Sequence, residues 1–158
     1  MILVVGGMAQ GKRKFAEGMF ADRAIAGSAF SENSGEGEAK ASWDWADGAK
    51  ASLEEFGASP YGYHFHLLIR RLLEGDPSLL ACSGWHGSAE DLPQRMAEFL
   101  LGTCRDRILV TEEIGSGIIP LDPLERRYRE TAGRVCCRLA QDADQVWRVC
   151  CGIGRRIK

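Results

Sequence analysis

Residues 1–13 read MILVVGGMAQGKR and carry the strongest indication of the fold. Residues 1–5 form an unbroken apolar run with β-branched side chains that ends at two glycines, which is typical of a buried strand. The segment that follows has the spacing G-x-x-x-x-G-K of a phosphate-binding loop. In such a loop the glycines let backbone N–H groups close around a phosphate, and the next helix directs its positive end toward the anion. The predicted nucleotide-binding residues are Gly6, Gly7, Met8, Ala9, Gln10, Gly11, Lys12 and Arg13.

Arg13 departs from the usual loop pattern, because this position ordinarily carries a serine or threonine whose hydroxyl ligates Mg²⁺. A guanidinium group does not bind a cation, but it can contact a phosphate in place of the metal. We therefore expect the loop to bind a nucleoside triphosphate, while its use of Mg²⁺ is left open. The alternative interpretation of the loop alone is a tight strand-to-helix turn with a surface lysine at position 12.

The rest of the chain alternates between predicted helices and strands. Apolar spacing predicts helices at about 12–23, 61–74, 88–102 and 123–142, with one short helix following a turn at Asp47-Gly48. Further strands are expected at 107–113 and 144–154. Residues 31–42 are polar and rich in Gly, Ser and Glu, so the region of about 30–60 is expected to be mobile or divergent. This alternation predicts a single α/β domain over 1–158: a three-layer fold of the P-loop NTPase type, with a mostly parallel sheet and helices on both faces.

Two adjacent carboxylates, Glu112 and Glu113, end the predicted strand 107–113. Ligands of open α/β sheets bind beyond the carboxyl ends of the strands. If this strand lies beside the first one, one of the two glutamates points toward the phosphate-binding loop, where it can hold Mg²⁺ or orient an attacking hydroxyl. Only one of them is expected to reach, because successive side chains of a strand face opposite ways. The alternative is an acidic strand end exposed to water.

The chain contains three histidines, His64, His66 and His86. His64 and His66 fall near the start of the helix predicted at 61–74, and positions two apart are about 200° apart around a regular helix. We therefore expect that they do not face one site. One of them, with His64 as the candidate, is a possible nucleophile or phosphate donor. The alternative is that both are polar residues of the helix surface or its edge.

Composition excludes several classes of protein. The formal net charge is −2, so bulk electrostatics do not predict binding to nucleic acid or to anionic membranes. Every apolar run is shorter than the roughly 18 residues of a membrane span, and no signal-peptide pattern follows the first strand, so we expect a cytoplasmic protein. The six cysteines are interpreted as reduced thiols, because Cys136-Cys137 and Cys150-Cys151 are adjacent pairs of strained bridging geometry.

Four stretches together resemble the adenosylcobinamide kinase/adenosylcobinamide-phosphate guanylyltransferase family of cobalamin biosynthesis. They are the glycine loop, VTEEIGSGIIP (110–120), RRYRETAGRV (126–135) and the final ADQVWRVCCGIGRRIK (143–158). Glu113 is the residue that matches the family's glutamate. Arg13 stands where the family has serine, and Cys136-Cys137 stands where it has Asn-Gln. Residues 24–60 contain no histidine, although the family places its guanylyltransferase nucleophile in that part of the chain.

The resemblance implies a nucleotide-dependent kinase, using GTP or ATP and Mg²⁺, that phosphorylates the aminopropanol hydroxyl of adenosylcobinamide. It implies Lys12 and Glu113 as catalytic residues, with Glu113 also as metal ligand. It further implies transfer of GMP to the product, a corrinoid substrate and a cytoplasmic homo-oligomer. The lack of a histidine in residues 24–60 leaves the GMP transfer open. The alternatives are a catalytically degenerate paralogue that binds nucleotide or corrinoid, and an enzyme of the same fold that acts on another alcohol.

Overall fold

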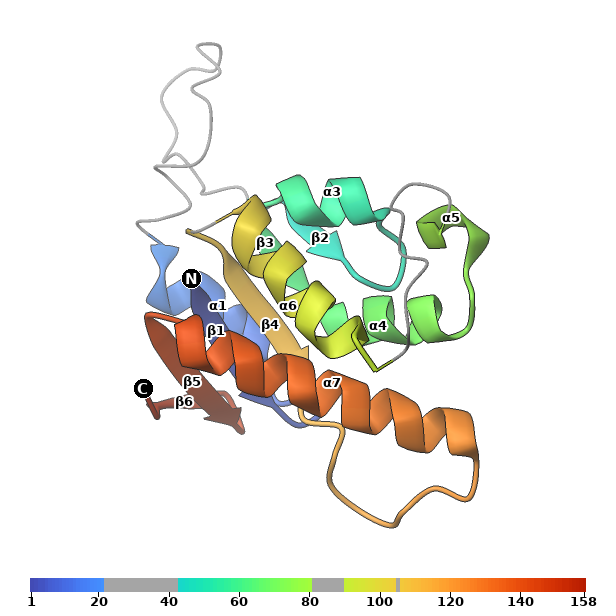
Figure 1. Cartoon of the computed structure of the whole chain (residues 1–158). Coiled ribbons are helices and arrows are strands. Elements are labelled where there is room, and N and C mark those ends of the chain that lie inside the picture. The colour runs from blue at the N-terminus through green and yellow to red at the C-terminus, as the bar shows by residue number, and fades with distance from the viewer. Residues whose placement is uncertain (22–42, 81–89, 105) are drawn as a thin grey trace.

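The computed structural model describes residues 1–21, 43–80, 90–104 and 106–158 and shows an α/β fold of three layers (Figure 1). Its strands are β1 (Ile2–Gly6), β2 (Trp45–Asp47), β3 (Tyr61–Tyr63), β4 (Ile108–Glu112), β5 (Gln145–Cys150) and β6 (Ile153–Arg156). Its helices are α1 (Lys12–Met19), α3 (Leu53–Ala58), α4 (Phe65–Leu73), α5 (Pro77–Leu80), α6 (Leu92–Thr103) and α7 (Pro123–Asp142).

Within the described residues the strands form one sheet in the order β2-β3-β4-β1-β5-β6. All neighbouring strands are parallel except β5 and β6, which form an antiparallel hairpin. β1 lies between β4 and β5, and the register places Gly6 opposite Glu112. The carboxyl ends of β1, β2, β3 and β4 therefore meet at one edge of the sheet, which is the edge where parallel α/β proteins bind ligands.

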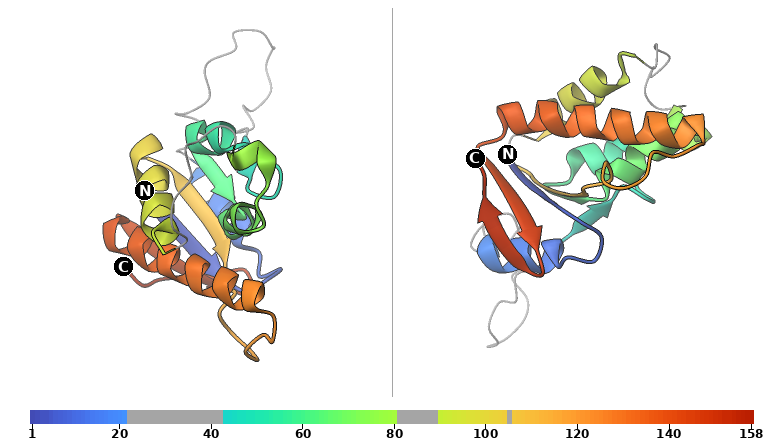
Figure 2. Two further views of the ribbon diagram at one scale, coloured as in Figure 1. Left: turned by 45° about the vertical axis from the view of Figure 1, so that its right-hand side comes forward. Right: turned by 90° about the horizontal axis from the view of Figure 1, so that it is seen from below.

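Helices cover both faces of the sheet, and this explains the unbroken apolar run of β1. Leu3 packs into a core built with α3, α4, α6 and α7, whereas Ile2 and Val4 pack on the opposite face with Ala16 of α1. The view from below separates the two layers, with α7 on one side of the sheet and α1 on the other (Figure 2). A strand that is buried on both faces needs apolar side chains on both, so its sequence does not alternate between apolar and polar residues.

The main expectations for the architecture are confirmed. The sheet is mostly parallel, helices lie on both faces, and the glycine-rich loop joins β1 to α1. The longest helix has the predicted bounds, 123–142. Its start is fixed by Asp122, whose carboxylate accepts a hydrogen bond of 2.9 Å from the backbone N–H of Leu124, and by the proline at the first helical position.

Three short strands were not anticipated. β2 and β3 have three residues each, and the helix expected from residue 61 begins only at Phe65 because Tyr61–Tyr63 is β3. The final predicted strand is a hairpin of β5 and β6, which turns through Cys151 and Gly152 at positive φ (51° and 78°). The mobile segment expected at about 30–60 lies partly outside the described residues, and its part from residue 43 onward contains β2 and α3.

The buried side chain of Arg107 holds the edge of the sheet that carries β2 and β3. Its Nη2 donates hydrogen bonds to the carbonyls of Phe56 (2.6 Å), Gly57 (2.9 Å) and Ser59 (2.7 Å), at the end of α3 and the start of the chain leading into β3. Its Nη1 lies 3.2 Å from the carbonyl of Leu100 in α6. A single guanidinium therefore satisfies backbone carbonyls from two helices and fixes the path of β3.

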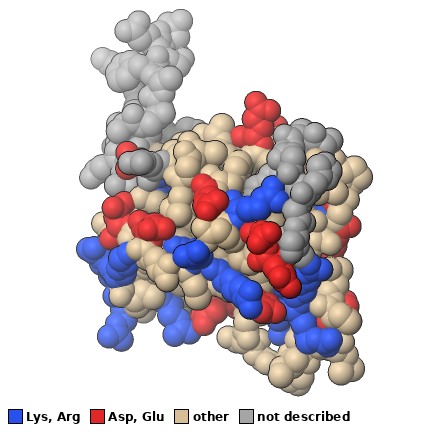
Figure 3. All heavy atoms as spheres, viewed as in Figure 1, with Lys and Arg blue, Asp and Glu red and all other residues tan. Residues whose placement is uncertain are grey.

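The molecular surface carries both signs of charge. On the face shown in Figure 3, Lys and Arg side chains are interspersed with Asp and Glu side chains, as expected for a chain of formal net charge −2. In the described residues, no helix has the length and apolar character needed to cross a bilayer.

Candidate functional site

The glycine-rich loop has the backbone that its sequence requires. Gly11 adopts φ +76°, in the left-handed region that favours glycine. A Cβ on Gly6 would lie 2.3 Å from the carbonyl oxygen of Val149, so only glycine fits between β1 and β5. The loop is anchored to the β5–β6 turn, because Gln10 Oε1 accepts a hydrogen bond from Cys151 N (2.6 Å) and its carbonyl accepts one from Gly152 N (2.9 Å).

Lys12 turns back into the loop. Its Nζ donates a hydrogen bond of 2.6 Å to the carbonyl of Gly7 and lies 3.8 Å from Glu112 Oε1, and only 7% of the residue is exposed. Burial lowers the pKa of Lys12, and the Coulomb attraction of Glu112 acts against that shift. The ammonium group thus lies at the loop interior, where it can contact a bound phosphate.

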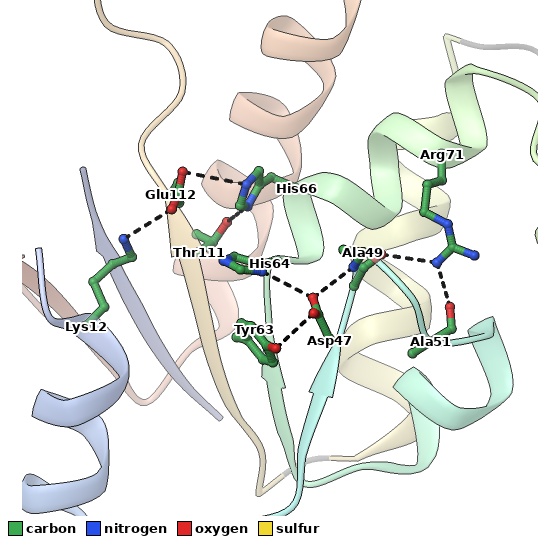
Figure 4. Close-up of polar contacts among 11 residues, drawn as sticks. Lys12, Asp47, Ala49, Ala51, Tyr63, His64, His66, Arg71, Thr111 and Glu112 are labelled. Atoms are coloured by element: carbon green, nitrogen blue, oxygen red, sulfur yellow. Dashed lines mark hydrogen bonds and ion pairs between the residues drawn. The ribbon is translucent and has the colours of Figure 1, made fainter. Parts of the chain in front are cut away.

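The carboxylate beside Lys12 belongs to Glu112. Its Oε2 lies 3.9 Å from His66 Nε2, so it stands between the lysine and the imidazole (Figure 4). Glu113, the glutamate predicted as catalytic and metal-binding, points away from Lys12 and forms an ion pair with Arg148 (Nη2–Oε2 3.2 Å). Glu113 directly follows β4, and its N–H donates a hydrogen bond of 3.0 Å to the Gly6 carbonyl, so the alternation of consecutive side chains extends to it. The catalytic and metal-binding role of Glu113 stays a prediction. Glu112 is the other glutamate of the pair considered in the sequence, and it is the one that lies beside Lys12.

The expectation that His64 and His66 do not face one site assumed that both lie inside a regular helix, and this premise does not hold. His64 is not inside the helix: it is the residue before α4 and has a left-handed backbone with φ 56°, so the helical spacing argument does not apply. The two ring centroids are 5.5 Å apart. His66 is buried, and its Nδ1 lies 3.2 Å from Thr111 Oγ1. Burial, followed by the nearby His64 and Lys12, lowers the pKa of His66 to about 4, so its ring is neutral at pH 7.

Asp47 was missed as a site residue, although it lies at the end of β2 and meets His64. Its Oδ1 lies 3.2 Å from His64 Nδ1 and accepts a hydrogen bond from Ala49 N (3.0 Å), while its Oδ2 accepts one from Tyr63 Oη (2.8 Å) (Figure 4). Burial acts to raise the pKa of Asp47, but the hydrogen bonds from Ala49, Tyr63 and His64 outweigh it, so the pKa is lowered. The available signal was an acidic residue directly before a glycine turn, Asp47-Gly48.

Arg13 points toward aromatic side chains of β2 and β3. Its guanidinium carbon lies 4.6 Å from the centroid of the Tyr63 ring and 5.6 Å from that of Trp45, and its Nη2 lies 3.8 Å from Glu17 Oε1. These contacts, typical of a cation over an aromatic face, fix the arginine at the rim of the loop. It occupies the place of the usual metal-ligating hydroxyl without supplying an oxygen.

These side chains line a cavity of about 410 Å³ at the start of α1. Its wall is formed by the loop, the first turn of α1, and the ends of β3 and β4, and it includes Lys12, Arg13, Tyr63, His64 and Glu112. A larger cavity of about 1190 Å³ lies on the β5–β6 side of the loop and is lined by Gly7, Gln10, Glu113, Arg148 and Arg155 among others. The loop therefore separates two cavities, and Lys12 and Glu113 line different ones.

The donor set near the loop does not form a metal site built from protein alone. In the described part of the chain, no three His, Cys, Asp or Glu side chains are placed to hold one ion. Both oxygens of Asp47 are occupied by hydrogen bonds, and Glu112 is a single carboxylate beside a cation. Mg²⁺ is commonly held by one or two carboxylates together with substrate phosphates. The residues therefore fit Mg²⁺ only as an ion that arrives bound to the nucleotide phosphates, with Glu112 as the protein carboxylate that could contact it.

Comparisons with known proteins relate a large part of the chain to one family. The family described as "Cobinamide kinase / cobinamide phosphate guanyltransferase" matches residues 68–157, more than half of the chain. The bifunctional adenosylcobalamin biosynthesis protein CobU of Salmonella typhimurium is 55% identical over 51 residues, and that of Escherichia coli is 51% identical over 51 residues. Each alignment covers 32% of this chain and 28% of the relative. The chain belongs to the cobinamide kinase / cobinamide phosphate guanyltransferase family.

Proposed function

We propose that this protein is a kinase that transfers the terminal phosphate of GTP or ATP to the hydroxyl of adenosylcobinamide. The observation that carries the proposal is the cavity at the loop, where Lys12, Glu112 and His64 converge on the start of α1. A hydroxyl that enters this cavity meets the terminal phosphate of a nucleotide bound by the loop. The proposal also draws on the family to which the chain belongs and on the activity for which that family is named.

Each group of the site has a role in this reaction. The loop backbone binds the phosphates through N–H groups, as the start of a helix does for anions. Lys12 exchanges the carbonyl of Gly7 for the phosphate and stabilises the charge that develops on the transferred group. When Mg²⁺ is bound with the nucleotide, it neutralises phosphate charge. We propose that Glu112 is the carboxylate that meets that ion, and that Glu113 positions a part of the substrate remote from the reacting hydroxyl, in the larger cavity.

The test is a transfer assay with labelled nucleotide and adenosylcobinamide. Label in the γ-phosphate of GTP reports phosphorylation, and label in the α-phosphate reports GMP transfer. We expect label from the γ-position in the corrinoid product, loss of this transfer in Lys12→Ala, and retention in Lys50→Ala, a control at an exposed lysine that does not line the cavity. A folded wild-type protein without transfer from either nucleotide refutes the kinase.

A second candidate is a nucleotide- or corrinoid-binding paralogue without catalysis. Arg13 favours it, because the arginine replaces the metal-ligating hydroxyl and is held by Tyr63 and Trp45. Calorimetry separates the two: nucleotide that binds equally with and without Mg²⁺ and is never consumed favours the paralogue. The homo-oligomer implied by the resemblance is supported by the exposed apolar side chains of Ile118, Ile119 and Leu121, and light scattering tests it. A cytoplasmic location stays a prediction.

A further inference from the structure

His64 has a left-handed backbone conformation at the cavity wall. Its φ of 56° is uncommon for a residue with a side chain and recurs at functional sites. Two contacts enforce it: its N–H donates a hydrogen bond of 3.1 Å to the carbonyl of Val110, and Gly48 packs against its backbone so closely that a Cβ there would lie 2.3 Å from the His64 carbonyl oxygen. The ring is thereby fixed toward the cavity and toward Asp47.

Asp47 determines which ring nitrogen of His64 carries the proton. The carboxylate is ionised, because Ala49 N–H and Tyr63 O–H both donate to it. An ionised carboxylate only accepts hydrogen bonds, so Nδ1 of His64, at 3.2 Å, carries the proton. In the neutral ring Nε2 is then left with a free electron pair. This is the arrangement of a carboxylate that orients a general base.

His66 is not placed to act as the general base. His66 is buried, its Nδ1 contacts Thr111, and its Nε2 faces Glu112. It is absent from the residues that line the cavity, whereas His64 is among them and is one-third exposed (36% of the side chain). The charged and titratable groups around His64 are Asp47 on β2, Tyr63 on β3, His66 on α4, Glu112 on β4, and Lys12 and Arg13 on α1.

We propose that His64 is the general base of the reaction and that Asp47 is its positioning residue. The inference rests on the proposed kinase function. As the substrate hydroxyl attacks, its oxygen forms a bond to the terminal phosphorus, the bond from that phosphorus to the bridging oxygen breaks, and the nucleoside diphosphate leaves. The hydroxyl proton moves to Nε2 of His64, and the resulting imidazolium stays paired with Asp47 until the proton passes to water.

The role of His64 is tested by variants whose new residue tolerates the positive φ of this position. Asn and Gly both tolerate positive φ, so His64→Asn and His64→Gly remove the base without straining the chain. We expect kcat for adenosylcobinamide phosphorylation to fall by ~10²–10⁴-fold in both, with GTP affinity unchanged. Added imidazole should restore turnover in His64→Gly, which a merely structural histidine would not show. A kcat within about threefold of wild type, or phosphate label attached to His64 itself, overturns the base role.

Asp47 is tested by a readout that does not depend on turnover. ¹⁵N NMR of labelled histidine in the full chain should show the proton of neutral His64 on Nδ1, and Asp47→Asn should move population to the other tautomer while lowering kcat at least ~10-fold with KM unchanged. Asp44→Asn, an exposed aspartate three residues away, should change neither. A wild-type proton on Nε2 overturns the pair. Wild-type protein without any transfer refutes the kinase and the base role together, whereas wild-type turnover with active His64→Asn refutes the base role alone.

Discussion

Replacing Arg107 by methionine should weaken the whole sheet edge that carries Asp47 and His64. The substitution keeps an unbranched apolar side chain that reaches about as far as Nε, and it removes five hydrogen bonds, which go to Phe56, Gly57, Ser59, Leu100 and Thr103. Three of the acceptors are the backbone carbonyls of Phe56, Gly57 and Ser59, which lose this donor in the variant.

The size of the effect follows from these contacts. Each buried carbonyl left without its donor costs about 1–3 kcal/mol, and the gain from no longer burying a charge offsets part of the sum. We expect the free energy of unfolding of Arg107→Met to fall by about 3–5 kcal/mol, a large part of the 5–15 kcal/mol of a typical domain.

Urea unfolding followed by circular dichroism measures this difference, and Arg127→Met serves as the matched control. Arg127 is exposed on α7, so its replacement should change the free energy of unfolding by less than about 0.5 kcal/mol. A loss of under about 1 kcal/mol in Arg107→Met would show that the guanidinium does not hold α3 and β3 as described.

Further predictions concern the loop and the buried histidine. Gly6→Ala should disrupt the loop and abolish nucleotide binding, because the new Cβ meets the Val149 carbonyl at 2.3 Å, whereas Gly18→Ala in α1 meets nothing within 4 Å and should stabilise the protein by up to about 1 kcal/mol. Equal nucleotide affinity of the two variants in calorimetry would contradict this. Burial lowers the pKa of His66 to about 4 in the folded protein, so the unfolded chain binds this proton more readily than the folded one. The free energy of unfolding should therefore fall by up to about 3 kcal/mol as the pH drops from 6.5 to about 4. Urea titrations over this range should show that His66→Gln loses this part of the slope; an unchanged slope would argue against a neutral buried ring.

The sequence predicted the centre of the sheet and missed its edge, for a physical reason. β1 and β4 are largely buried on both faces, so apolar residues run without a break through residues 2–5 and 108–110 and give a strong signal. β2 and β3 have three residues each, too few to show a period, and the aromatic run of β3 continues into α4 without a break in polarity. The helix pattern therefore extended backward over β3, and the bend at His64 was not visible.

Only those features of the candidate site that depend on neighbouring residues in the sequence were predictable. The loop geometry follows from its glycines, and the pleat correctly limits Lys12 to one of the two glutamates. Which one it is depends on the register that sets Gly6 opposite Glu112. The contact between Asp47 and His64 depends on the parallel pairing of β2 with β3, which places Asp47 opposite Tyr63. Such pairing across separate segments has no local signature.

Nucleotide binding by the glycine-rich loop is tested most directly by calorimetric titration of wild-type protein and of Lys12→Ala with GTP and with ATP, in the presence of Mg²⁺. We expect saturable binding of at least one nucleotide by the wild type, and a loss of about 10–100-fold in affinity in the variant, because one charge-assisted hydrogen bond to a phosphate is removed. Wild-type protein that binds neither nucleotide, or a variant that binds as tightly as wild type, would contradict the claim that this loop and its lysine enclose a triphosphate.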